Sequence, residues 1–183
     1  MRITGGTARG VRLIVPQALH VRPTSDRVRG ALFQLVGQAV EGAVVLDLYA
    51  GTGALGIEAL SRGAARVDFV EQDSRMCRVI QQNLESTGFE DRGHVSRARV
   101  AQALQFLKGP YDLVVMDPPY EELQEMRQAM EALGRASLLN KGAMVVLESS
   151  SRAVLEDRYG ALHSRSHRRY GDSALSIYSM EDT

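Results

Sequence analysis

Four consecutive residues, Asp117-Pro118-Pro119-Tyr120, follow an apolar run at 113–116 and combine hydrogen-bond acceptors with an aromatic ring. Proline has no backbone N–H, so the Asp117 carboxylate and the Pro118 carbonyl can both accept from one donor group. The exocyclic NH2 group of a nucleic-acid base offers two such hydrogens, and Tyr120 could stack on a base withdrawn from its neighbours. These residues therefore predict chemistry on a base amino group, although the same sequence could simply end a strand.

A second motif follows the apolar run at 44–48, where glycines lead into a predicted helix. Gly51, Gly53 and Gly56 satisfy the pattern G-x-G-x-x-G of nucleotide-binding turns. Glycine lets the backbone approach a ligand closely, and the N-terminus of a helix offers unpaired N–H groups. A carboxylate at the end of the next predicted strand can accept from both ribose hydroxyls. The candidate cofactor-binding residues are Asp47, Tyr49, Ala50, Gly51, Thr52, Gly53, Glu71, Gln72 and Gln102.

The charge of Asp47 distinguishes between two cofactors that suit such a turn. A dinucleotide would place a negatively charged pyrophosphate beside this carboxylate, which opposes binding. S-adenosylmethionine carries an ammonium and a sulfonium group, so Asp47 would attract it and could anchor the methionine amino group. The pattern therefore favours S-adenosylmethionine, and a tight turn without a ligand remains the alternative.

Apolar runs alternate with helical stretches in the body of the chain, which predicts a parallel sheet covered by helices on both faces. Two more strands flank Gly171-Asp172 and predict an antiparallel hairpin at the sheet edge. Both motifs then fall at the carboxyl edge of the sheet, on a methyltransferase domain at 41–183. A basic extension at 1–40, a short β-ribbon followed by a helix, is expected to pack on that domain. Strands are expected at 44–48, 67–70, 95–98, 113–116, 143–147, 161–170 and 174–180, and helices at 25–38, 54–62, 74–86, 101–107 and 123–136.

The chain has 22 basic and 22 acidic residues, but the basic ones are concentrated at the start. Residues 1–30 contain six arginines and one acidic residue. Arginine suits bidentate contacts with phosphate, so these residues predict RNA binding, with an ordinary solvated surface as the alternative. The candidate RNA contacts are Arg2, Arg9, Arg12, Arg22, Arg168 and Arg169.

Several function classes receive no support from the composition. Cys77 is the single cysteine, so no disulfide or thiolate metal site is expected. His163 and His167 lie four residues apart, but no further ligand stands at suitable spacing, and we expect no metal. No stretch is apolar for the length that crosses a bilayer, so we expect a cytoplasmic protein without a membrane partner.

Nearly the whole chain resembles the RsmD-type 16S ribosomal RNA guanine-N2 methyltransferases. The blocks at the start are more specific than the glycine turn and the Asp-Pro-Pro-Tyr motif, which adenine-N6 and cytosine-N4 enzymes also carry. The marks are Arg2-Ile3, Gly5-Gly6, Arg9-Gly10, Arg22-Pro23-Thr24, Asp26 to Arg29, Ala31-Leu32-Phe33, Asp47 to Gly56, Glu58 to Ala64, Val70-Glu71, Asp73, Asp117 to Tyr120, and Tyr170-Gly171-Asp172.

The resemblance implies a Rossmann-like sheet of seven strands, S-adenosylmethionine as cofactor, and the N2 group of guanine 966 in 16S rRNA as target. The RNA partner would be a partly or fully assembled small ribosomal subunit. Asp117 and Tyr120 would hold the flipped guanine. Many members of the family have an Asp after the third strand that binds the adenine amino group; residues 100–102 lack one, and Gln102 could offer an acceptor instead.

Three other functions compete with this interpretation. An adenine-N6 methyltransferase on DNA or RNA would suit residues 117–120, but a DNA enzyme of this kind should carry a sizeable target-recognition domain. A nicotinamide-dependent oxidoreductase would explain the glycines and leave Asp47 and residues 117–120 unexplained. A noncatalytic RNA-binding module would explain the arginines alone.

Overall fold

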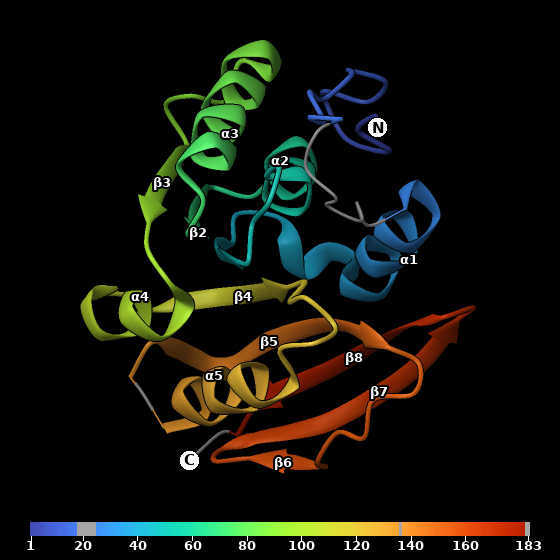
Figure 1. The fold of residues 1–183 in the computed structure, drawn as a ribbon, viewed down its shortest axis with the longest axis vertical. Helices are drawn as coiled ribbons and strands as arrows, with labels where there is room; N and C mark the ends of the chain where they lie inside the picture. The colour runs from blue at the N-terminus through green and yellow to red at the C-terminus, as the bar shows by residue number, and fades with distance from the viewer. Residues whose placement is uncertain (18–24, 136, 182–183) are drawn as a thin grey trace.

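The computed structural model describes residues 1–17, 25–135 and 137–181, which form one mixed eight-stranded sheet with helices on both faces (Figure 1). The strand order is β3-β2-β1-β4-β5-β8-β7-β6. The first five strands in this order are parallel, and β8, β7 and β6 continue the sheet antiparallel. The strands are β1 Val44–Leu48, β2 Arg66–Glu71, β3 Gly93–Arg97, β4 Tyr111–Met116, β5 Leu139–Ser150, β6 Arg158–Tyr159, β7 Leu162–Tyr170 and β8 Ser173–Met180.

Two clusters of buried apolar residues fill the space between the sheet and its helices, one on each face. The first joins α1, α2 and α3 to one face of the sheet, and the second joins α4 and α5 to the other. Near-continuous apolar runs such as Val44–Leu48 are typical of central parallel strands, which are buried on both faces. The helices are α1 Asp26–Val36, a short 3₁₀ turn at Gly37–Val40, α2 Ala54–Ser61, α3 Ser74–Thr87, α4 Val100–Phe106 and α5 Leu123–Arg135. Within the described ranges, no helix is both long and apolar enough to cross a membrane.

The predicted α/β architecture is confirmed, with one difference at its margin. The sheet has eight strands instead of seven, because two residues, Arg158–Tyr159, pair with the start of β7 and add a short edge strand. The short ribbon at the start of the chain consists of one antiparallel bridge between Arg2 and Arg12, flanked by backbone hydrogen bonds from Ile3 to Val11 and from Leu13 to Met1. The residues between its two arms turn at Gly6 and also bond to Ser61 at the end of α2.

The start of the chain, residues 1–17, is fastened to α2 by the buried carboxylate of Glu58. Its oxygens accept from the Thr4 N–H at 2.9 Å, the Thr4 hydroxyl at 2.7 Å and the Gly5 N–H at 2.9 Å. Two guanidinium groups meet the same carboxylate, Arg29 Nε at 3.2 Å and Arg62 Nε at 3.0 Å. Arg29 is fully buried, so this member of the basic start of the chain is structural and does not face solvent.

Candidate functional site

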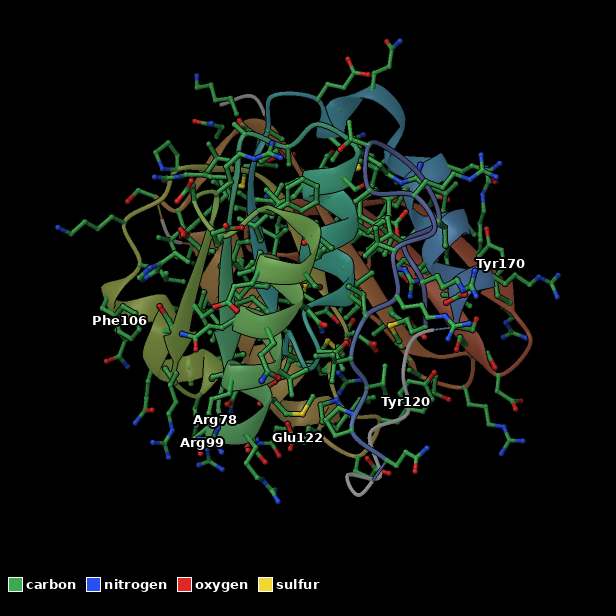
Figure 2. The ribbon with its side chains drawn as sticks, turned by 90° about the horizontal axis from the view of Figure 1, so that it is seen from above. Arg78, Arg99, Phe106, Tyr120, Glu122 and Tyr170 are labelled. Atoms are coloured by element: carbon green, nitrogen blue, oxygen red, sulfur yellow. The ribbon has the colours of Figure 1, made fainter. Side chains whose placement is uncertain are left out.

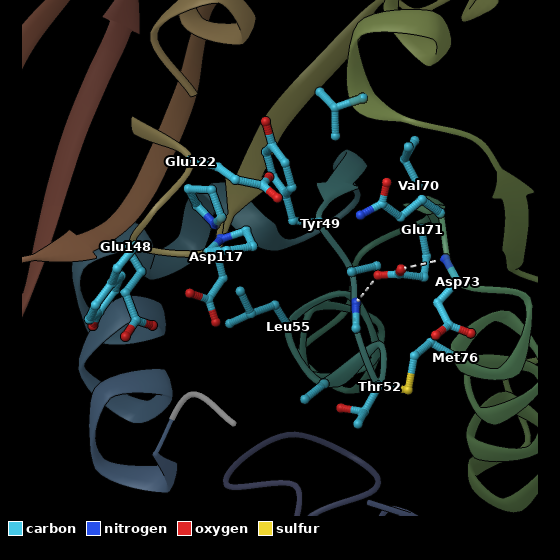
Figure 3. Close-up of a pocket in the computed structure, with 18 of the residues that line it drawn as sticks. Tyr49, Thr52, Leu55, Val70, Glu71, Asp73, Met76, Asp117, Glu122 and Glu148 are labelled. Atoms are coloured by element: carbon cyan, nitrogen blue, oxygen red, sulfur yellow. Dashed lines mark hydrogen bonds between the residues drawn. The ribbon is translucent and has the colours of Figure 1, made fainter. Parts of the chain in front are cut away.

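A cavity of about 600 Å³ opens at the carboxyl ends of the parallel strands, where both sequence motifs lie. This volume is in the usual range for sites that hold small molecules. The strand order reverses between β1 and β4, and such a switch point is where open α/β sheets bind their ligands. Figure 3 shows the glycine turn and Glu71 on one side of the cavity and Asp117 and Glu148 on the other.

The turn between β1 and α2 is tight and takes an unusual backbone conformation. Tyr49, Gly51 and Gly53 all have positive φ angles, of 59°, 55° and 79°. Tyr49 is the only non-glycine residue in the described ranges with this conformation, which costs about 1–3 kcal/mol and often marks a functional site. At Gly56, a Cβ atom would lie 2.3 Å from the Phe69 ring, so this glycine allows α2 to pack closely on β2.

Glu71 ties the glycine turn to the end of β2. One carboxylate oxygen accepts from the Gly51 N–H at 2.8 Å, and the other accepts from the Asp73 N–H at 2.8 Å (Figure 3). A carboxylate has about four acceptor sites, so further hydrogen bonds from hydroxyl groups in the cavity remain possible. This arrangement fixes the Glu71 carboxylate at the cavity wall, and its contact with ribose stays a prediction.

Asp47 lies behind the turn and is not among the described residues that line the cavity. Its Oδ2 atom accepts from the Gly56 N–H at 2.8 Å, in the first turn of α2. The N-cap residue of this helix, Gly53, has no side chain, so Asp47 supplies the acceptor that a capping side chain would provide. Burial raises the pKa of Asp47 well above its usual value, and the nearby charges of Asp117 and Glu71 raise it further.

The other predicted cofactor residues divide into two groups. Gly53 and Gln102 are not among the described residues that line the cavity. The Gln102 side chain accepts from the Arg99 N–H at 3.4 Å and so caps its own helix, α4. The predicted residues that do line the cavity are Tyr49, Ala50, Gly51, Thr52, Glu71 and Gln72.

Residues 117–120 form the opposite wall of the cavity, and all four line it. The Tyr120 hydroxyl lies 2.8 Å from the Ser173 Oγ atom, which in turn donates to Glu148 Oε1 at 3.1 Å. Because Ser173 has one hydroxyl hydrogen and gives it to Glu148, Tyr120 must be the donor in the first of these bonds. The ring that sequence analysis assigned to base stacking is therefore held through its hydroxyl group.

Sequence analysis missed Glu148, although a signal for it exists. It directly follows the apolar run at 143–147, at the point where the parallel pairing of β5 with β4 stops, so it lies at the same edge as Glu71 and Asp117. It is 4% exposed and lines the cavity. Ser173, which starts β8, and Tyr170, which ends β7, had no such signal, because only the hairpin pairing brings them to this edge.

The cavity is strongly acidic. Among the described residues, its lining includes seven carboxylate side chains and one arginine, Arg99. Such a site attracts a ligand with positive charge and opposes a pyrophosphate, so it disfavours the nicotinamide alternative. The acidic residues are Glu71, Asp73, Asp117, Glu121, Glu122, Glu125 and Glu148.

Two neighbouring groups stay uncharged in this environment. Burial, with the charges of Glu122 and Glu125, raises the pKa of Tyr49 to about 12. Cys77 lies in α3 with its thiol 3.4 Å from the Glu71 carbonyl oxygen, and burial followed by the Glu71 charge raises its pKa. A thiol that stays protonated is a poor nucleophile, which agrees with a packing role.

Five of the six arginines predicted to contact RNA are exposed, and Arg22 lies outside the described residues. Two of them are next to residues of the cavity wall in the chain, since Arg2 follows Met1 and Arg169 precedes Tyr170. Figure 2 shows Tyr120, Glu122 and Arg99 along one side of the molecule, with Tyr170 further round. The exposed arginines are Arg2, Arg9, Arg12, Arg168 and Arg169.

Comparison with known proteins agrees with this geometry. Residues 1–179 match the family described as "Conserved hypothetical protein 95". Ribosomal RNA small subunit methyltransferase D of Escherichia coli is 38% identical over 156 residues, which cover 81% of this chain and 74% of the relative. The chain belongs to the RsmD family of S-adenosylmethionine-dependent methyltransferases.

Two further comparisons extend over the full length of this RsmD-family protein. YlbH of Bacillus subtilis is 29% identical over 181 residues, covering 97% of this chain and 98% of YlbH. The solved structure of yhhF from Escherichia coli superimposes with a TM-score of 0.88 at 29% identity, over 100% of this chain and 99% of that one. These two comparisons therefore include the start of the chain and the closing hairpin along with the central sheet.

Proposed function

We propose that this protein transfers a methyl group from S-adenosylmethionine to the exocyclic N2 atom of a guanine in 16S ribosomal RNA, at guanine 966. The substrate would be a partly or fully assembled small ribosomal subunit, which implies a cytoplasmic site of action. The main support is that one cavity joins the glycine turn to residues 117–120, so a cofactor and a base amino group could meet there.

The residues on the glycine-turn side fit the proposed cofactor. S-adenosylmethionine would supply an electrophilic methyl group on a positively charged sulfur atom. The Glu71 carboxylate is already fixed by two backbone N–H groups and can accept from ribose hydroxyls. Tyr49, Ala50, Gly51, Thr52 and Gln72 would form the remaining contacts, and Asp47, one layer behind, would support the turn through its bond from the Gly56 N–H.

Residues 117–120 would orient the amino group and take up its charge. The lone pair of an exocyclic amine is conjugated into the ring and is weakly nucleophilic. Acceptors at both hydrogens, here the Asp117 carboxylate and the Pro118 carbonyl, favour a more tetrahedral nitrogen and stabilise its developing positive charge. Asp117 can then hold the proton that the nitrogen releases, while Tyr120 stacks on the flipped base.

The decisive experiment identifies the product. The protein is incubated with methyl-labelled S-adenosylmethionine and, separately, with small-subunit particles, free 16S rRNA and DNA, and the RNA or DNA is digested to nucleosides. We expect N2-methylguanosine from the particles, mapped to one position by primer extension. Labelled N6-methyladenosine would overturn the proposal in favour of the adenine-N6 alternative. If none of the three pools became labelled, the RNA target would be rejected.

A further inference from the structure

Glu148 and Asp117 directly follow the last pair of residues that joins β5 to β4. The parallel register of β4 and β5 pairs Met116 with Leu147, so the next residue of each strand is one of these acids. Met116 and Leu147 both belong to the apolar cluster beneath α4 and α5, and side chains alternate along a strand. Both carboxylates therefore turn to the opposite face, toward α1, and both line the cavity (Figure 3).

The Glu148 carboxylate is held in place by the same residues that hold Tyr120. Hydrogen bonds run from the Tyr120 hydroxyl to Ser173 and from Ser173 to Glu148 Oε1, at 2.8 Å and 3.1 Å. Glu148 as a residue is 4% exposed, and taking a carboxylate charge out of water is costly. A base that stacks on Tyr120 with its amino group at Asp117 would bring the neighbouring atom of its Watson–Crick edge close to this second carboxylate.

We propose that Glu148 selects guanine by accepting the N1–H of the flipped base beside Asp117. This inference rests on the function proposed above and names the residue that decides which base that site accepts. A carboxylate only accepts hydrogen bonds, so it requires a donor opposite it. Guanine presents N1–H next to its N2 amino group.

The alternatives present the wrong group at that position. Adenine has a lone pair on N1 beside its N6 amino group, and cytosine has one on N3 beside its N4 amino group. A lone pair facing a buried carboxylate would be repelled, and the carboxylate would lose its partner. Sites built to bond a substrate N–H reject analogues that lack it far more strongly than apolar pockets reject a changed shape. The second carboxylate would thus separate guanine from the other bases with amino groups.

The test uses a base that differs from guanine at this edge but keeps the amino group. 2-Aminopurine retains the exocyclic amine at C2 and has a lone pair, with no hydrogen, at N1. Small subunits are reconstituted with 16S rRNA ligated to carry guanosine or 2-aminopurine at the target position. Methyl transfer is measured as kcat/KM on both for the native protein, Glu148→Gln, Glu148→Asp and an exposed control, Glu85→Gln.

The native protein should prefer guanosine by on the order of 10- to 100-fold, the range expected for one hydrogen bond to a charged group. Glu148→Gln should bring the ratio close to one, because an amide can donate to the N1 lone pair, while Glu148→Asp and Glu85→Gln should keep the preference. Cofactor affinity by calorimetry and the melting temperature should be unchanged in all three variants.

Two outcomes would overturn the inference. The first is a native protein that does not distinguish the two bases, and the second is a Glu148→Gln variant that keeps the native ratio because it loses equal activity on both bases. Equal losses would assign Glu148 to the placement of Tyr120. A native protein that makes no N2-methylguanosine on the guanosine particle would instead reject the proposed function, so the two failures are distinguishable.

Discussion

Replacing Glu58 with alanine should strongly destabilise the protein and release the start of the chain from α2. The carboxylate is fully buried and accepts hydrogen bonds from two residues of the start of the chain, Thr4 and Gly5. It also pairs with Arg29 and Arg62, whose side chains are 0% and 25% exposed. Truncation would leave the Arg29 guanidinium buried beside fewer counter-charges and remove the hydrogen bonds that hold Thr4 and Gly5 on α2.

Removing one partner of a buried ion pair typically costs about 3–5 kcal/mol. Arg62 can turn toward water, whereas Arg29 is enclosed, so we place the cost within that range. Small domains are stable by about 5–15 kcal/mol in total, so the variant should unfold at a much lower urea concentration. The measurement is urea unfolding followed by circular dichroism, with RNA affinity as a second readout.

The matched control is Glu131→Ala, which breaks the exposed i,i+4 pair with Arg135. Exposed helix pairs contribute about 0.3–0.5 kcal/mol, so the control should lose almost nothing. If Glu58→Ala loses less than about 1 kcal/mol, or no more than the control, the buried cluster does not carry the stability assigned to it. A destabilised variant that still binds RNA normally would show that attachment of residues 1–17 is not needed for RNA binding.

Asp117→Ala should nearly abolish methyl transfer and leave cofactor affinity intact by calorimetry, because its carboxylate acts on the target amino group; a parallel loss of affinity would place it on the cofactor. Tyr120→Phe should be mild and Tyr120→Ala severe, at about 1–3 kcal/mol for a lost base stack; equal losses would mean that its hydroxyl matters more than its ring. Asp47→Asn still accepts from Gly56 and lacks the buried charge. The pKa of Asp47 is higher in the folded than in the unfolded protein, so ionisation lowers the stability of the native protein as pH rises between these two values. The free energy of unfolding of Asp47→Asn should therefore increase relative to that of the native protein over this interval. A difference that does not change with pH would refute the raised pKa. Asp47→Ala, which lacks an acceptor, should weaken cofactor binding. Alanine at three exposed arginines should leave cofactor binding normal and weaken the salt dependence of RNA affinity. Each phosphate contact adds about 0.7–0.9 to the slope of log affinity against log salt concentration. An unchanged slope would assign RNA contact to β7 instead. The three are Arg2, Arg9 and Arg12.

The strand ends could be predicted from the sequence because a parallel sheet gathers them at one edge. Apolar runs before Glu71 and Asp117 gave the direction of each strand, and alternation with helices made the strands parallel. The same reasoning would have found Glu148, which follows the run at 143–147. Ser173 and Tyr170 could not be found in this way, because their approach to the cavity depends on the pairing of β8 with β5 and β7.

Sequence patterns could not predict contacts that depend on how the helices pack. A carboxylate before a glycine turn can face the ligand or the helix that follows, and periodicity does not choose between them; the structure bonds Asp47 to the Gly56 N–H. In the same way, arginine count at the start of the chain could not separate exposed Arg2 from buried Arg29. The difference arises because Arg29 points from α1 onto Glu58 of α2.

The charges around the cavity bear on how RNA could be held there. Seven carboxylates among the described lining residues would repel phosphate groups, and interactions between exposed charges fade over about 8 Å at physiological salt. The exposed arginines lie in segments that adjoin the cavity wall at Met1 and Tyr170, so they could bind phosphates outside this acidic region. A nucleobase is uncharged, and it alone could enter without electrostatic cost. The acidic cavity and its basic surroundings therefore favour a mechanism in which the RNA backbone stays at the surface and a single flipped base enters.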